Sequence, residues 1–165
     1  MKRFFTIFTS ILMLLFAANG GSALDGAFAG LELGAAVNTR NGMTLGVGIN
    51  AGMDMNKYYA LGLKTAYGHD METVGVLETS AIIRYYLPLP LPISRVYVQA
   101  DMGGSFFFEY GEVFPSLMGG LTVGWRFPMG DILFIEPSIR GGYPFGIGMA
   151  FGAGMFIDLE KLRKN

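Results

Sequence analysis

Several residue types are missing or scarce in this 165-residue sequence, and each absence excludes particular kinds of site or function. There is no cysteine, which excludes disulfide bonds, thiolate metal sites and lipid-modified cysteines. Charged residues make up 15% of the chain, against about a quarter in ordinary soluble proteins. The net charge of −1 gives no basic surface for nucleic acid. Histidine occurs once and no metal-ligand spacing is present, so we expect no metal, no cofactor and no nucleic-acid partner.

Long apolar runs are also missing, except at the N-terminus. Lys2 and Arg3 precede the apolar run FFTIFTSILMLLFAA, and the small residues of NGGSALDG follow it. This is the layout of a secretory signal peptide, and we expect cleavage after Ala23, with Ala18 as an alternative. A single N-terminal membrane anchor is the other interpretation of this run. Beyond residue 18, no apolar run approaches the roughly 20 residues that a membrane-spanning helix needs.

Apolar residues and glycine are what the chain has in quantity. Apolar residues make up 52% of it, 25 residues are glycine, and the mean hydropathy is +0.42. Such hydropathy without a second apolar span of helical length is typical of membrane strands. In MTLGVGINAGMD, residues 43–54, every second residue is apolar. That period predicts a β-strand, because successive side chains of a strand point to opposite faces.

The same alternation occurs in eight runs, separated by turn signals such as the Asn-Gly pair at 41–42 and the proline-rich segment 88–94. A tilted strand crosses a membrane in roughly 9 to 11 residues, and each run is long enough. We therefore predict an all-β fold, an eight-stranded antiparallel up-and-down transmembrane β-barrel. The predicted strands cover residues 26–38, 43–54, 58–68, 76–87, 95–109, 116–127, 132–143 and 147–157.

The two faces of these runs differ in chemical character. One face is apolar and carries no charge, whereas the other holds many glycines and every charged residue of the runs. A soluble barrel would instead show long charged side chains and little glycine on its outside. An eight-stranded barrel has an interior just wide enough for side chains, where enclosed charges must pair. We therefore expect the apolar face to contact lipid and the lumen to hold an ion-pair network of Glu32, Lys64, Glu78, Arg84, Asp101, Arg126, Glu136 and Arg140.

Aromatic residues gather toward the ends of the runs. Membrane barrels place aromatic girdles at both lipid–water interfaces, so these residues are expected on the outer face near the barrel ends. The candidates are Tyr58, Tyr59, Tyr67, Tyr85, Tyr86, Tyr97, Trp125, Phe127 and Tyr143.

The segment GWRFPMGDILFIEPSIRGGYPFGIGMAFGAGMFI, residues 124–157, looks like the last two hairpins of a known group of proteins. With the signal peptide and the eight alternating runs, it makes the chain resemble the small outer-membrane β-barrel proteins of the OmpA/OmpX/OmpW type. The resemblance implies a place in the bacterial cell outer membrane, in contact with outer-membrane lipid. The expected organisation is a signal peptide (1–23), a barrel (24–157) and a charged C-terminal periplasmic tail (158–165).

The resemblance also implies partners in assembly, namely periplasmic chaperones and the barrel-assembly machinery. In that family the last strand carries an assembly signal, and the matching residues are Gly152, Met155, Phe156 and Ile157. This chain departs from the family pattern because residues 158–165 follow Ile157. Both termini would lie in the periplasm, and the outer connections would be residues 38–42, 69–75, 110–115 and 144–146.

Three functions remain open from the sequence. The first is a structural barrel, or one with a narrow path for small solutes, whose charged residues fill or line the lumen. The second is a secreted, soluble, lipocalin-like binder with its apolar face turned inward around a ligand. The third is a lipid-modifying outer-membrane enzyme using His69, Asp70 and Glu72. Because no serine stands close to His69 to act as a nucleophile, we expect no enzymatic activity.

Overall fold

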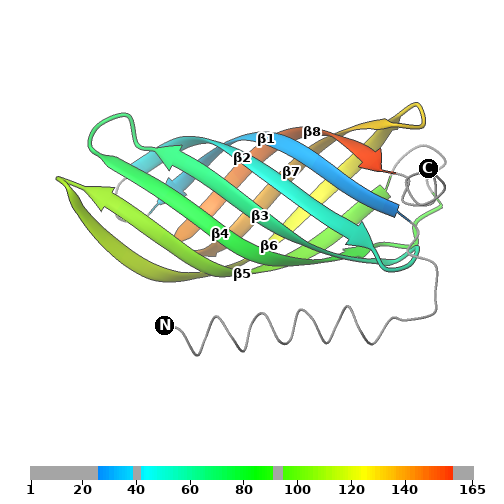
Figure 1. The fold of residues 1–165 in the computed structure, drawn as a ribbon, viewed down its shortest axis with the longest axis horizontal. Helices are drawn as coiled ribbons and strands as arrows, with labels where there is room; N and C mark the ends of the chain where they lie inside the picture. Colours follow the sequence, from blue (N-terminus) through cyan, green and yellow to red (C-terminus); the bar gives the residue numbers. More distant parts are fainter. Residues whose placement is uncertain (1–25, 39–41, 91–94, 158–165) are drawn as a thin grey trace, which may run out of the picture.

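The computed structural model describes residues 26–38, 42–90 and 95–157, which form a closed antiparallel barrel (Figure 1). The strands follow one another around the barrel in chain order, and β8 closes it by pairing with β1. This confirms the predicted eight-stranded up-and-down architecture. The strands are β1 (Gly26–Asn38), β2 (Gly42–Asp54), β3 (Tyr59–His69), β4 (Val74–Tyr86), β5 (Arg95–Glu109), β6 (Glu112–Met129), β7 (Leu133–Tyr143) and β8 (Phe145–Ile157).

No helix in this part of the chain is long and apolar enough to cross a membrane. The expected signal peptide, residues 1–23, and the expected tail, residues 158–165, lie outside the described residues. Those two boundaries therefore stay predictions.

The register of the strands keeps each chemical face continuous around the barrel. Leu33 pairs with Val47, Val47 with Tyr67, and Tyr67 with Leu77, so apolar residues of four strands form one row. Because a shift of one residue would move a whole strand face to the other side, this register fixes which side chains point outward.

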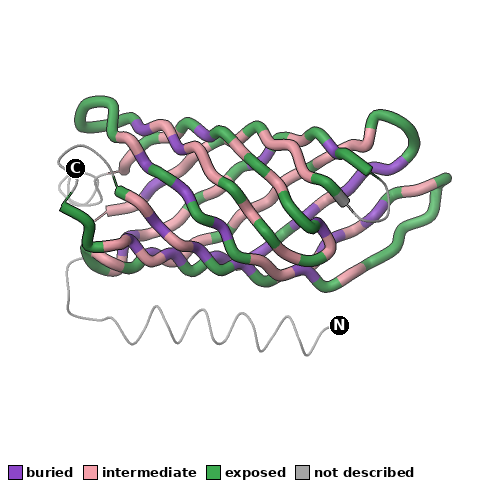
Figure 2. Tube along the Cα trace, turned by 180° about the vertical axis from the view of Figure 1, so that it is seen from behind, coloured by how far each residue is buried: buried purple, intermediate pink, exposed green. Residues whose placement is uncertain are grey.

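Burial shows that the apolar face is the outer one (Figure 2). Leu31 and Leu33 are 67% and 66% exposed, whereas Arg84 and Arg126 are 2% and 1% exposed. Buried and exposed residues alternate along the strands, as Figure 2 shows. The predicted orientation is therefore confirmed. A lipocalin-like binder would need the opposite arrangement, with the apolar face lining the lumen.

The hairpin of β5 and β6 is longer than the sequence predicted. Residues 110–115 were expected to connect the two strands, but pairing continues to Glu109 and Glu112, and only Tyr110 and Gly111 form the turn. Both turn residues have positive φ, at 50° and 85°, as a tight hairpin turn requires. The predicted connection was therefore wrong, because residues 112–115, Pro115 included, belong to β6.

A proline is tolerated there because that part of β6 pairs on one side only. Pairing between β6 and β7 begins at Gly119, so the stretch before it is a free edge on which a missing N–H leaves no gap in a ladder. This hairpin projects furthest from the barrel, at the end opposite the start of β1 (Figure 1). We call this the far end, and the end where β1 starts and β8 stops the near end.

Two other connections at the far end are also shorter than predicted. Instead of residues 69–75, only Asp70–Thr73 separate β3 from β4, and instead of 144–146, only Pro144 separates β7 from β8. The connection expected at 38–42 lies partly outside the described residues.

The outer aromatic residues form pairs near the near end. The rings of Tyr59 and Tyr85 lie 5.0 Å apart, and those of Trp125 and Phe127 stack at 6.0 Å. Tyr86 and Tyr97, however, were wrongly assigned to the girdle. Both are buried inside the lumen, because they share the inward parity of the charged residues on their strands.

The loop between β3 and β4 is organised by two side chains. The carboxylate Oδ1 of Asp70 accepts hydrogen bonds from the backbone N–H groups of Glu72, Thr73 and Val74, each at 2.9 Å. The Nδ1 atom of His69 accepts one from the N–H of Met71 at 3.0 Å. The three backbone hydrogen bonds to Asp70 hold the pKa of its carboxyl below the usual range, and the bond from Val74 is the largest cause.

The order of this loop should therefore depend on pH. A lowered folded-state pKa means that the contribution of Asp70 is present at neutral pH and is lost as the pH falls through that lowered value. We expect the Val74 amide to keep its full hydrogen-exchange protection above about pH 4, where a free aspartate is half protonated, and to lose it progressively below that pH. Asp70→Ala should show weak protection at every pH. Equal protection in both proteins would contradict this role.

Candidate functional site

The lumen gathers the charged side chains of the barrel into three groups. Each of the eight residues of the predicted network forms at least one ion pair there. The groups are Arg84, Arg126 and Glu136; Glu78, Asp101 and Arg140; and Glu32 with Lys64.

The first group centres on Glu136, which accepts four hydrogen bonds. Its Oε1 atom accepts from Arg84 Nη2 at 2.9 Å and from the Tyr97 hydroxyl at 2.7 Å. Its Oε2 atom accepts from Arg84 Nη1 at 3.0 Å and from Arg126 Nε at 2.7 Å. One carboxylate therefore binds two buried guanidinium groups, which joins β7 to β4 and β6 across the lumen.

Further polar contacts extend this group, which we call the Glu136 cluster. Arg84 donates from Nε and Nη2 to the amide oxygen of Gln99 at 3.1 and 2.8 Å. Arg126 donates from Nη1 to the hydroxyl of Tyr86 at 2.8 Å, and that hydroxyl donates to Asp54 at 3.3 Å. With Asp54 included, the buried members of the cluster hold two positive and two negative charges and are balanced; the exposed Arg95 lies outside them, 5.2 Å from the Tyr86 ring centroid.

Aromatic rings enclose both guanidinium groups. Arg84 lies 3.9 Å from the ring centroid of Tyr97, and Arg126 lies 4.1 and 4.4 Å from those of Phe134 and Phe28. All these rings are buried. Cation–π contact and the exclusion of water both strengthen such a site. The Glu136 cluster and its rings therefore fill the lumen toward the near end.

The second group has the reverse stoichiometry, with one guanidinium between two carboxylates. Arg140 donates from Nη1 to Glu78 and from Nη2 to Asp101, both at 2.8 Å. These bonds link β7 to β4 and β5. The third group is the ion pair of Lys64 and Glu32, to which Asn50 donates a long hydrogen bond of 3.5 Å.

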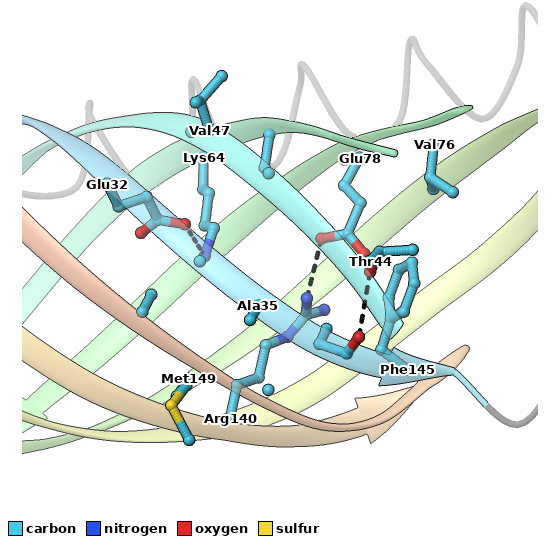
Figure 3. A pocket seen from close by; sticks show the side chains of 18 of the residues that line it. Glu32, Ala35, Thr44, Val47, Lys64, Val76, Glu78, Arg140, Phe145 and Met149 are labelled. Carbon is cyan, nitrogen blue, oxygen red and sulfur yellow. Dashed lines mark hydrogen bonds and ion pairs between the residues drawn. The ribbon is translucent and has the colours of Figure 1, made fainter. Parts of the chain in front are cut away.

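A small cavity lies beside these two groups. Its volume is about 90 Å³, and Figure 3 shows Glu32, Lys64, Glu78 and Arg140 pointing into it. Toward the far end the lumen turns apolar. Its lining there is a buried cluster, which we call the apolar cap, of Val74, Val76, Phe107 and Phe145, with Ala36 packed against it.

Several members of the Glu136 cluster were not predicted as site residues. They are Phe28, Asp54, Tyr86, Tyr97, Gln99 and Phe134. The available signal was strand parity, since all of them except Asp54 share the inward face of their strand with a predicted charged residue. Asp54 is itself a charged residue on the inward face of its run, whereas a search restricted to charged side chains could not find the other five.

The candidate assembly residues lie at the near end of β8. Gly152 pairs with Glu32 and Glu136, Met155 is exposed on the outer face, and the ring of Phe156 lies 5.0 Å from that of Phe134. Ile157 is the last residue of the strand. Recognition by an assembly machine remains a prediction.

The residues considered for lipid-modifying chemistry serve the β3–β4 loop. The ring nitrogen of His69 that faces Asp70 already accepts the Met71 N–H, and Asp70 is occupied by three backbone amides. Within the described residues, no three or more histidine, cysteine, aspartate or glutamate side chains are grouped as ligands for a metal ion.

No family model matches the chain, and no curated protein sequence does either. Solved structures do match. The N-terminal β-barrel domain of OprF from Pseudomonas aeruginosa has a TM-score of 0.57 and 18% identity, over 79% of this chain and 97% of that domain. Neisserial surface protein A (NspA) has a TM-score of 0.57 and 11% identity, over 79% and 94%. A de novo designed transmembrane β-barrel has a TM-score of 0.52 and 17% identity, over 82% and 98%.

The fold is that of a small transmembrane β-barrel. The resemblance to small outer-membrane barrels that the sequence suggested is thus confirmed for the fold. At these identities the likeness carries no further information about ligands or activity.

Gly124 should be needed for the Glu136 cluster, because a Cβ atom there would overlap the ring of Tyr97. We expect Gly124→Ala to displace Tyr97 and to destabilise the barrel by about 1–3 kcal/mol, the usual cost of overpacking. Gly119→Ala, on the same strand, is the control, because its Cβ would lie 3.5 Å from the nearest atom. Urea unfolding in lipid vesicles, followed by Trp125 fluorescence, measures both. Equal stability of the two variants would contradict this role for Gly124.

Replacing the central carboxylate should cost more. Glu136→Gln leaves Arg84 and Arg126 buried without an acid partner, and breaking a buried ion pair in this way costs about 3–5 kcal/mol. Glu32→Gln, in the less buried pair with Lys64, should cost clearly less. The same unfolding assay compares them. A Glu136→Gln barrel as stable as Glu32→Gln would show that the cluster does not stabilise the fold.

Proposed function

We propose that this chain is an integral outer-membrane protein of bacteria and that its barrel is a closed structural element rather than a channel. The observation that carries the proposal is a lumen filled at one end by a balanced ionic cluster and at the other by apolar side chains. The proposal has two parts, location in the membrane and closure of the lumen, and a different feature of the barrel supports each.

The outer face supports the membrane location. Among its exposed apolar side chains are Leu31, Val47, Leu121 and Met149, which come from four different strands. Monomeric soluble proteins rarely expose a continuous apolar surface of this extent, because it would promote aggregation. The two natural structural neighbours are bacterial outer-membrane barrels, which supports the same location for this chain.

The contents of the lumen support closure. Arg84 and Arg126 are each 2% exposed or less and have buried rings packed against them, which supports a blocked lumen on the near side. On the far side the cap residues Val76 and Phe107 are buried. A narrow path for small solutes would need both blocks to open, and a cavity of about 90 Å³ has room for about six to nine waters at roughly 10–15 Å³ each.

Assembly into the membrane would use the partners implied by resemblance, namely periplasmic chaperones and the barrel-assembly machinery. Gly152, Met155, Phe156 and Ile157 remain the proposed recognition residues on β8. Its closing position beside β1 supports this, because the barrel is complete only when β8 has paired.

Two measurements test the proposal. We expect the protein in a carbonate-resistant membrane fraction, with a gel mobility that changes on heating as folded barrels show. In planar bilayers, the refolded protein should give no conductance above that of a heat-denatured sample of the same preparation. Discrete conductance steps from the folded form alone would overturn the closed lumen, and a detergent-free soluble monomer would overturn the membrane location.

A further inference from the structure

The charges within the three ionic groups of the lumen balance in two of the groups and not in the remaining one. The Glu136 cluster is neutral, and Glu32 is matched by Lys64. Arg140, in contrast, faces both Glu78 and Asp101, which leaves one negative charge without a positive partner among the described lumen residues. An uncompensated charge inside a barrel is costly, because the surrounding medium screens it poorly.

The inner face of the barrel in this region also holds oxygen atoms that lack hydrogen-bond partners. One carboxylate oxygen of Glu78 and one of Asp101 are free, and the hydroxyls of Ser80, Ser105 and Thr122 are also unpartnered. Each of these five residues is at most 7% exposed. Buried polar atoms are nearly always paired with protein or with a bound species, so these free oxygens indicate a missing occupant.

Strand pairing spreads these oxygens along three adjoining strands and does not bring all five to one place, because Ser105 pairs with Ser116, six residues before Thr122 on β6. Ser105 of β5 lies directly opposite Glu78 of β4, and Ser80 is the next inward residue from Glu78. Asp101 binds the same guanidinium as Glu78. Thr122 of β6 lies opposite Arg140. Arg140 thus links Glu78, Asp101 and Thr122, and we call these four residues the oxygen corner.

The oxygen corner opens onto the cavity of about 90 Å³. Glu78, Thr122 and Arg140 belong to the cavity wall, and Figure 3 shows Glu78 and Arg140 meeting there. A site for a single water needs only about 10–15 Å³ of such space, so an ion with one or two waters fits. Arg140 Nε, which also lacks a partner, can donate to one of these waters.

We propose that the oxygen corner binds one monovalent alkali cation, held by Glu78 and Thr122 at the cavity wall, with Asp101 as a further oxygen ligand and water completing the shell. Carboxylate, hydroxyl and water oxygens are hard ligands that suit hard cations. The oxygen corner lacks one positive charge. A divalent ion would therefore leave it with an excess positive charge. Water alone would satisfy the hydrogen bonds but would leave the negative charge.

Thermal stability in different salts tests this binding. The protein is refolded into micelles in sodium chloride, potassium chloride or N-methyl-D-glucamine chloride at matched ionic strength. Refolding in each salt matters, because the closed lumen would exchange its contents slowly. The heat-dependent gel shift then gives the Tm. We expect a higher Tm in at least one alkali salt than in N-methyl-D-glucamine chloride, with saturation as that salt replaces the organic cation.

Three variants locate the site. Glu78→Gln keeps the size of the side chain and removes the charge, so the Tm should no longer depend on the cation. Thr122→Val removes one oxygen without changing charge and should weaken the dependence. Thr44→Val is the matched control, because Thr44 lines the same cavity, is equally buried at 5%, and already donates to the carbonyl of Ala36 at 3.3 Å.

Equal Tm values for the unmodified protein in all three salts would overturn the proposal and would leave water, or a proton on a carboxylate, as the occupant. A cation effect that Glu78→Gln and Thr122→Val both retain would place the ion elsewhere and overturn the assigned site. Loss of the effect in Thr44→Val to the same degree as in Thr122→Val would also overturn it. If Glu78→Gln does not fold, the two threonine variants still decide.

Discussion

One carboxylate shared between two arginines is the interaction on which the interior of this barrel depends. Arg84 and Arg126 carry large, always charged groups into a space that lipid surrounds, where each alone would be very unfavourable. Glu136 meets both, and Tyr97 adds a fourth hydrogen bond. The three strands that supply the ionic groups are thereby held at fixed distances across the lumen.

The distribution of glycine follows from that requirement. The guanidinium groups and their rings fill the lumen so fully that a facing strand has no room for a Cβ atom. The residues opposite them are therefore glycines. A Cβ on Gly124 would strike the Tyr97 ring, one on Gly154 the Phe134 ring, and one on Gly52 the Phe28 ring. Glycine weakens a strand in isolation, so its presence here reflects close approach between side chain and backbone rather than strand preference. The apolar outer face, which contacts no such bulk, is where large residues such as Leu31 and Phe151 lie.

The sequence predicted the strands and their orientation well, because alternation is a local property that eight runs repeat. It placed Glu32, Glu136 and Arg140 on the inner face by parity alone. It could not say which acid meets which base. Arg84 and Glu136 are 52 residues apart and lie on strands that are not neighbours, so their contact depends on barrel closure. A local sequence pattern does not predict which side chains meet across the lumen.

The errors have the same origin. Residues 110–115 were assigned to a connection, although Pro115 can stand in β6: a proline breaks a ladder only where a neighbour needs its N–H, and β7 does not reach that part of β6. Tyr86 and Tyr97 were counted as girdle residues because they lie near strand ends. Their parity already pointed inward, and a tyrosine hydroxyl near buried arginines can serve as donor and acceptor at once. Where position along a strand and parity disagree in a narrow barrel, parity should take precedence. Parity decides whether a side chain points into the lumen or outward, whereas the membrane interface can meet a strand at any of several residues.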